Sequence, residues 1–93
     1  MKYELMLILK PMLTEDIRAN VLNKIEDNLT KLKGKVLSQD LWGKRHLAYI
    51  IDGNEEGYYV VYTFELDNSK IHEFEGKLKF MNDIMRYLIS KED

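Results

Sequence analysis

The residues best suited to chemistry in this sequence are two cations and a histidine that follow a tryptophan. They stand in the run Trp42-Gly43-Lys44-Arg45-His46. Cations beside a planar ring suit contact with phosphate groups and stacking on nucleic-acid bases. A charged edge strand that resists aggregation would carry the same cations. The run therefore leaves two interpretations open, a nucleic-acid contact and a protective edge.

No arrangement of side chains typical of an enzyme occurs in the chain. The two histidines, His46 and His72, lack metal-ligand spacing, and there is no cysteine. The turn that follows the first apolar run, Lys10-Pro11-Met12-Leu13, has none of the glycines of a phosphate-binding loop. Three acidic pairs, Glu15-Asp16, Glu26-Asp27 and Glu55-Glu56, are adjacent in sequence, and their side chains diverge on a helix or in a turn. We therefore expect neither catalysis nor a cofactor or metal ion.

Length and charge describe the kind of chain that must hold these residues. The sequence has 93 residues, 45% hydrophobic and 32% charged, which suits one domain over residues 1–93. A net charge of −2 argues against holding nucleic acid by bulk electrostatics alone. Residues 1–50 carry nine Lys and Arg against six Asp and Glu, whereas residues 51–93 carry five against ten. We therefore expect an anionic partner to meet the first half.

The apolar and polar pattern predicts four strands and two helices. Residues 5–9 form an apolar run too short for a signal peptide or a membrane span, so we expect a cytoplasmic protein without membrane contact. The expected elements are a strand over 3–9, a helix from the N-cap Thr14 to Gly34, strands over 35–51 and 58–66 joined by a turn over 52–57, a helix that follows the capping residues 67–69, and a strand over 83–90. Trp42-Gly43 is expected to form a bulge or bend within the long strand.

This order of elements predicts an α+β fold. With right-handed crossovers, β-α-β-β-α-β gives a ferredoxin-like split β-α-β sandwich, a four-stranded antiparallel sheet with two helices on one face. If Phe64 and Leu66 face the helices, strand alternation leaves an apolar set on the open face. That set is Met6, Ile8, Tyr59, Val61, Ile84 and Leu88. It predicts either an interface with a partner protein or a merely semi-polar solvated face.

RNA recognition motifs share this topology and stack bases on aromatic residues of the third strand. Here Glu56 stands where a basic residue is needed, Tyr59 where a small residue is needed, and Val60 where the second stacking ring belongs. Generic binding of single-stranded RNA through the open face is therefore not expected.

Four segments of the chain together resemble a known family, bacterial small-subunit ribosomal protein six. They are Lys2-Tyr-Glu-Leu-Met-Leu-Ile-Leu-Lys-Pro11, Leu41-Trp-Gly-Lys-Arg-His-Leu-Ala-Tyr49, Glu56-Gly-Tyr-Tyr59 and Ile84-Met-Arg-Tyr-Leu88. The resemblance implies a structural protein of the small ribosomal subunit that binds 16S ribosomal RNA together with small-subunit ribosomal protein eighteen. Carried over by position, the family's basic run falls on Lys44, Arg45 and His46, and its last-strand arginine falls on Arg86.

Two further lysines extend the expected RNA contact. Lys2 and Lys91 are added because each is expected near the end of a strand. The alternative to the ribosomal function is a dimeric regulatory domain that binds a small molecule, dimerising through the open face. Such a domain needs a pocket with converging polar groups, and the sequence identifies none, so no small-molecule substrate is expected.

Overall fold

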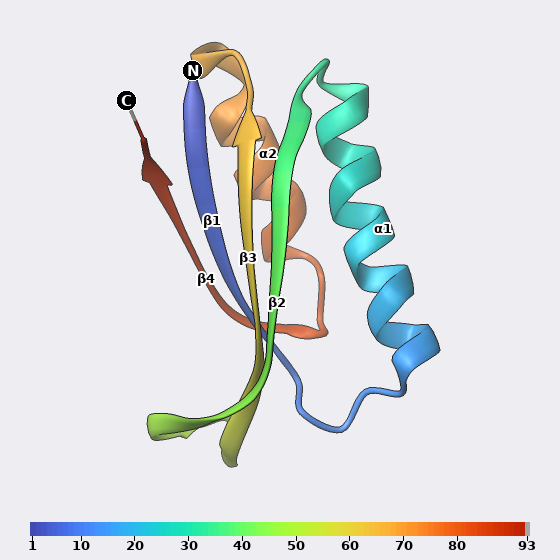
Figure 1. The fold of residues 1–93 in the computed structure, drawn as a ribbon, viewed down its shortest axis with the longest axis vertical. Coiled ribbons are helices and arrows are strands. Elements are labelled where there is room, and N and C mark those ends of the chain that lie inside the picture. Colours follow the sequence, from blue (N-terminus) through green and yellow to red (C-terminus); the bar gives the residue numbers. More distant parts are fainter. Residues whose placement is uncertain (93) are drawn as a thin grey trace.

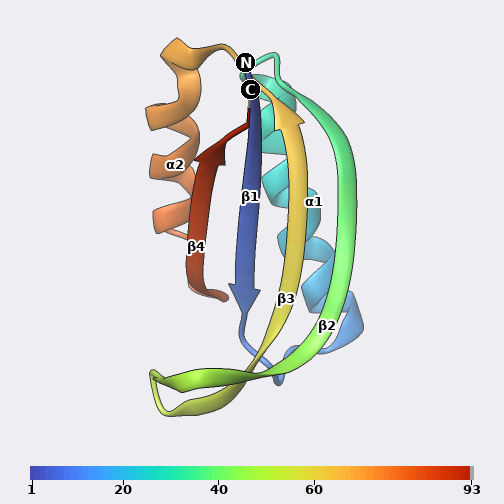
Figure 2. The ribbon, with the colours of Figure 1, turned by 60° about the vertical axis from the view of Figure 1, so that its left-hand side comes forward.

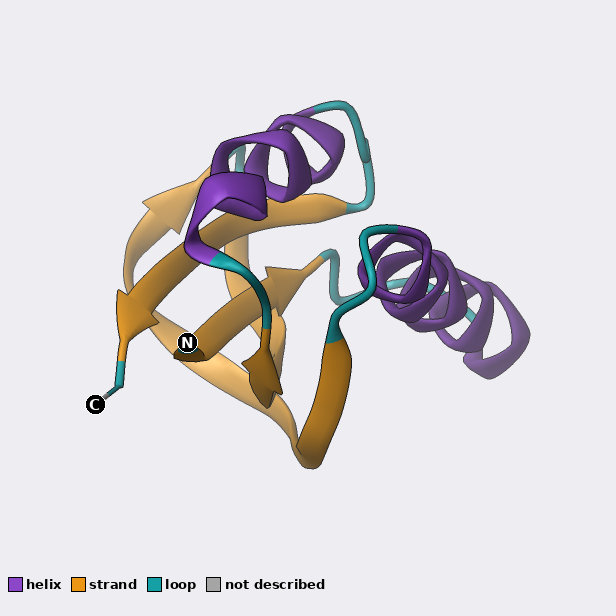
Figure 3. Ribbon diagram, turned by 90° about the horizontal axis from the view of Figure 1, so that it is seen from above, coloured by secondary structure: helices purple, strands orange, loops and turns teal. Residues whose placement is uncertain are grey.

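The computed structural model describes residues 1–92, so Asp93, the last residue of the predicted domain, lies outside the described part. Its elements are β1 (Lys2–Leu9), α1 (Glu15–Lys31), β2 (Lys35–Ile51), β3 (Asn54–Glu65), a short 3-10 turn (Asn68–Lys70), α2 (Ile71–Lys79) and β4 (Ile84–Lys91). The strands pair antiparallel in the order β2-β3-β1-β4. Both helices lie on one side of the sheet (Figure 1, Figure 3). The predicted split β-α-β sandwich is confirmed.

The core lies between the sheet and the helices. Alternate residues of β1 and β3 point into it, because strand side chains alternate between the two faces. Phe64 and Leu66 belong to this set, so their predicted facing is confirmed. The buried cluster contains Tyr3, Leu5, Leu7, Leu9, Val21, Leu22, Ile25, Leu29, Val60, Tyr62, Phe64, Leu66, Phe74 and Leu78. Within residues 1–92 no helix is long and apolar enough to cross a membrane.

The first helix ends earlier than the sequence pattern predicts. Thr14 is the N-cap as expected, but α1 stops at Lys31 rather than at Gly34. Lys33 takes the left-handed conformation, with φ at 64°, and the amide of Gly34 donates to the carbonyl of Leu29 at 2.7 Å. This is a helix-terminating motif in which the left-handed position need not be glycine. Gly34 is therefore the residue that follows the helix-terminating turn and precedes β2.

The turn between β2 and β3 is shorter than predicted. Asp52 and Gly53 both have positive φ, at 49° and 79°, and Ile51 pairs with Asn54. Positive φ at both central residues defines the two-residue turn that matches the twist of a β-hairpin. The six-residue turn over 52–57 was wrong, because Asp-Gly alone reverses the chain and the rest of that segment pairs in β3.

The long strand β2 carries the hairpin beyond the rest of the sheet. It has 17 residues, whereas β1 and β4 have 8 each. The predicted bulge is confirmed, since the register with β3 shifts between Leu41 and Gly43, and Gly43 has φ at 82°. The outer half of the hairpin bends across the sheet on the side opposite the helices (Figure 1, Figure 2).

One residue predicted on the open face lies on the other side. The pairing of β4 with β1 shifts so that Arg86 is opposite Ile8 while Ile84 is opposite Leu9. Met85 is therefore an extra residue, and Ile84 packs against the helix-side core. Placing Ile84 on the open face was wrong, because a bulge of one residue reverses the alternation that had been extended back from Arg86.

Candidate functional site

The open face of the sheet changes from charged at one end to apolar at the other. Strand register places one residue from each strand side by side in rows across this face. The first row has Lys35, Glu65 and Lys2; the next has Ser38, Thr63, Glu4 and Ser90; the third has Asp40, Val61, Met6 and Leu88; the last has Gly43, Tyr59, Ile8 and Arg86. Apart from Asp40 and Arg86, which stand on the two edge strands, the two final rows form an apolar centre that no helix covers. Leu88 is 62% exposed there.

Five of the six predicted interface residues thus lie together on the open face, and Ile84 does not. Met6, Ile8, Tyr59 and Val61 are half-buried, while Leu88 is exposed. The bent hairpin covers part of this set, since its Leu47, Tyr49 and Ile51 line a pocket with Met6, Ile8, Tyr59, Arg86 and Leu88. Ile51 is 4% exposed, whereas Tyr49 remains 66% exposed. The hairpin therefore forms one wall of an apolar pocket.

The hairpin can approach the sheet because residue 57 has no side chain. A Cβ built on Gly57 would overlap Cγ2 of Ile8 and lie 3.3 Å from Cδ2 of Leu47. This packing was missed from the sequence. Two sequence features could have predicted it. Leu47, Tyr49 and Ile51 alternate in a strand that is longer than its neighbours, and the opposite strand has a glycine near its start.

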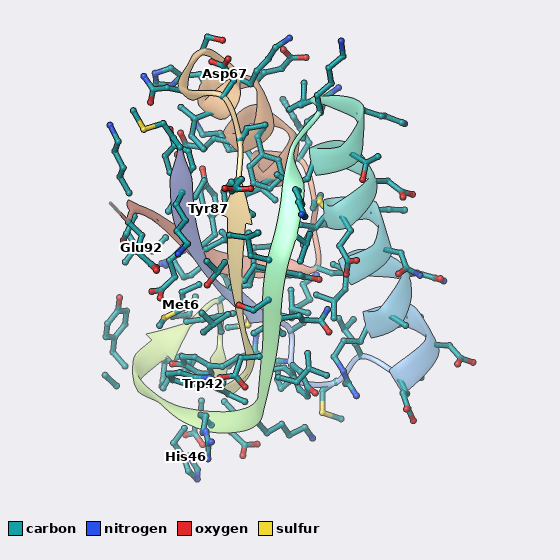
Figure 4. All side chains as sticks on the ribbon, turned by 45° about the horizontal axis from the view of Figure 1, so that its top comes forward. Met6, Trp42, His46, Asp67, Tyr87 and Glu92 are labelled. Atoms are coloured by element: carbon teal, nitrogen blue, oxygen red, sulfur yellow. The ribbon has the colours of Figure 1, made fainter. Side chains whose placement is uncertain are left out.

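The predicted RNA-contact residues fall into two groups at opposite ends of the sheet. Lys44, Arg45 and His46 are exposed in the outer half of β2, and Arg86 lines the pocket at the same end. Figure 4 shows His46 projecting from the bent part of the hairpin. Pairing places Lys44 opposite Tyr58 and His46 opposite Glu56, whereas Arg45 is opposite Gly57, so strand alternation turns Arg45 to the other side of the ribbon.

Lys2 and Lys91 form the second group, near the two chain ends. The amide of Glu92 donates to the carbonyl of Lys2 at 2.7 Å, and Lys91 pairs with Tyr3. Figure 2 shows this end of the sheet opposite the hairpin turn. The structure therefore does not bring all six predicted residues to one place.

An aromatic pair stands beside the basic run. The ring of Trp42 stacks on Tyr59, with ring centroids 6.4 Å apart and an interplanar angle of 14°. Its indole Nε1–H donates to Oδ2 of Asp40 at 3.0 Å. Trp42 is 43% exposed, so the pair is accessible from solvent.

Polar contacts on the helix side hold the sheet and helices in place. The hydroxyl of Tyr62 donates to Oε2 of Glu26 at 2.8 Å, and Nε2 of Gln39 donates to the same tyrosine oxygen at 2.8 Å. Burial, with the hydrogen bond to Glu26, raises the pKa of Tyr62 above its ordinary value. Tyr62 therefore stays protonated over the physiological range and joins α1, β2 and β3.

The uncovered sheet face, the bent hairpin and the exposed cations define an α+β sandwich whose surface suits macromolecular partners. The chain belongs to the ribosomal protein S6 family, whose profile matches residues 2–91. Small ribosomal subunit protein bS6 of Fusobacterium nucleatum is 40% identical over 92 residues, covering 99% of this chain and 98% of that protein. The bS6 of Thermoanaerobacter pseudethanolicus is 38% identical, covering 98% and 96%.

A solved structure gives the same result. The crystal structure of 30S ribosomal protein S6 from Thermotoga maritima matches with a TM-score of 0.92 and 28% identity, over 98% of this chain and 86% of that one. As a member of this family the chain is a structural protein of the small ribosomal subunit, in the cytoplasm, and not an enzyme. The family assignment decides against the dimeric regulatory domain.

Proposed function

We propose that this protein binds 16S ribosomal RNA together with small-subunit ribosomal protein eighteen, with the partner protein on the open sheet face and the RNA at the hairpin. The observation that carries the proposal is the apolar centre of the open face next to the exposed cations of β2. Monomeric proteins seldom leave contiguous apolar surface uncovered. The apolar surface suits a protein partner, and the adjoining basic segment suits RNA.

The partner surface consists of Met6, Ile8, Tyr59, Val61 and Leu88, with the exposed Tyr49 at its rim. Ile84 is left out because it packs against the core. The middle of the face has few charges, as in the centre of protein interfaces, where charged residues are depleted. A net charge of −2 on this chain favours a basic partner.

The RNA surface consists of Lys44, Arg45, His46 and Arg86. Their exposure lets them reach phosphate oxygens, which position a protein on RNA without reading its sequence, while Arg86 also donates from Nη1 to the carbonyl of Met85 at 3.3 Å. Lys2 and Lys91 are secondary contacts, since they lie at the other end of the sheet. A basic partner would supply much of the phosphate neutralisation that this mildly acidic chain cannot.

The test is a salt titration of binding to a central-domain fragment of 16S ribosomal RNA, with and without ribosomal protein eighteen. We expect tight, salt-dependent binding when the partner is present and weak binding without it. Arg45→Ala should weaken that binding by about tenfold, roughly 1.4 kcal/mol, and reduce the salt slope by about one.

Lys77→Ala is the matched control, because Lys77 is an exposed cation on α2, away from the open face. It should leave the affinity within about twofold of wild type. Equal losses for the two variants would show that only net charge matters and would remove Arg45 from the RNA surface. No binding with the partner present would refute the proposed function.

A further inference from the structure

The aromatic pair and its carboxylate have a geometry that suits one chemical group. Trp42 lies in the β2 bulge, and its ring stacks on Tyr59 while its N–H is held by Asp40 at 3.0 Å. We propose that Trp42 and Asp40, supported by Tyr59, form a receptor for an arginine side chain of a basic protein partner. The inference rests on the proposed function, because it concerns how the partner protein is held.

The electrostatics of the pair favour a cation. The face of an indole ring is the most negative of the protein aromatics and attracts cations within about 6 Å of its centroid. Asp40 adds a full negative charge at the edge of the same ring, and it is exposed. A carboxylate that accepts one hydrogen bond through Oδ2 still has a second oxygen able to accept another. Two sources of negative potential therefore meet at one exposed point.

A guanidinium group meets both features at once. It is planar, so it can stack on the indole, and its N–H groups form a fork that matches a carboxylate. An ammonium group would satisfy the charge but not the stacking. The side chain of Trp42 is fixed between Tyr59 and Asp40, so little conformational freedom remains to be lost on binding. Arginine is thus the side chain that the site fits best.

A nucleobase fits the same ring less well. A base that stacked on Trp42 would bring its phosphates toward the carboxylate of Asp40, which would repel them. Lys44, the nearest predicted RNA contact, lies two residues along the strand from Trp42, about 7 Å, so salt screens its repulsion of a bound arginine only in part and the carboxylate of Asp40 must offset the rest. Asp40 is also opposite Val61, at the edge of the proposed partner surface. The site therefore belongs to the protein interface and not to the RNA surface.

The experiment measures the affinity of the full chain for ribosomal protein eighteen by calorimetry. Asp40→Asn removes the charge and keeps an oxygen that can accept the indole N–H, and Trp42→Leu removes the ring. Each should weaken binding about three- to thirtyfold. The double variant should lose little more than the larger single loss, since both residues hold the same cation. Trp42 is the only tryptophan, so its fluorescence in the wild type should change on binding.

Asp52→Asn is the control, because it removes the same charge at the hairpin turn, where the positive φ of 49° also suits asparagine. It should stay within about twofold of wild type. If the wild type binds the partner and both site variants bind as tightly, the arginine receptor is refuted while the proposed function stands. If the wild type fails to bind the partner, both proposals fail.

A parallel titration with the RNA fragment alone separates the two kinds of ligand. An arginine receptor predicts that Trp42→Leu leaves the affinity for RNA within about twofold. If Trp42→Leu weakens RNA binding and Asp40→Asn strengthens it, the ring stacks on a base and the inference is overturned. Thermal unfolding of each variant establishes that it is folded. If Trp42→Leu destabilises the hairpin, Asp40→Asn still tests the arginine receptor, because it replaces an exposed side chain.

Discussion

Replacing Gly57 by alanine should crowd the hairpin more than a methyl group added at Gly43 or Gly53, where nothing lies within 4 Å of the built Cβ. The built Cβ overlaps Cγ2 of Ile8, and carbon atoms in contact normally stand about 3.5–4.0 Å apart. Cγ2 is held close to the backbone of Ile8, so it cannot turn away as the end of a long side chain would. Either the hairpin or β1 must therefore move. Overpacking of this kind costs about 1–3 kcal/mol of the free energy of unfolding.

Urea unfolding followed by circular dichroism measures the loss, and a thermal scan should show a fall in Tm of about 4–8 °C for each kcal/mol. Ile8→Ala removes the overlapping methyl group, so the double variant Gly57→Ala with Ile8→Ala should be more stable than the sum of the two single losses predicts. Gly76→Ala is the control, because Gly76 lies in α2 with nothing within 4 Å of its built Cβ. It should stabilise the protein by roughly 0.5–1 kcal/mol. A Gly57→Ala variant as stable as wild type, or strictly additive losses, would contradict the packing of the hairpin.

Two other predictions concern the turn and the helix-side polar contacts. Gly53→Ala should lower the free energy of unfolding, measured in urea, by about 1–2 kcal/mol, because alanine tolerates the φ of 79° poorly. Nothing lies within 4 Å of the built Cβ, so the loss would come from backbone conformation and not from crowding. An unchanged stability would contradict the turn geometry. The pKa of Tyr62 is raised above the ordinary 10.0, so the folded state holds that proton more tightly; the contribution of this group to stability should be level below pH 10 and fall as the pH rises above it. Tyr62→Phe should reduce the loss of stability above pH 10. Part of that loss should remain, because the pKa of Tyr87 is also raised. An identical pH profile would show that Tyr62 is not the group responsible.

Local patterns were sufficient to predict the order of elements and most of their facing. Alternation in residues 58–66 placed Phe64 on the helix side, and the dense turn formers after Ile51 located the hairpin. These features depend on neighbours in sequence. Turn length was misjudged because polar residues such as Glu55 and Glu56 were counted as turn, although strands at a hairpin end also carry them.

The errors on the open face come from effects that no local pattern contains. The facing of Ile84 depends on a one-residue shift in the pairing of β4 with β1, which joins residues about 75 positions apart in the sequence. The pocket depends on Gly57 meeting Ile8, two residues almost fifty positions apart. The aromatic pair likewise needs the register of β2 with β3 before Trp42 and Tyr59 become neighbours. Long-range register therefore decided which site residues could be predicted.

The bent hairpin also explains how the two proposed ligands could depend on each other. Its inner side chains, among them Leu47 and Ile51, face the apolar pocket, while Lys44 and His46 are exposed on the same ribbon. Lys2 lies about 20 Å away at the other end of β1, too far to share a single phosphate contact with them. A partner that fills the pocket would therefore fix the position of the cations at the hairpin, not those near the chain ends. Partner binding should therefore raise RNA affinity through this ribbon, and Gly57→Ala, which displaces the hairpin, should reduce that gain when RNA binding is titrated with and without the partner.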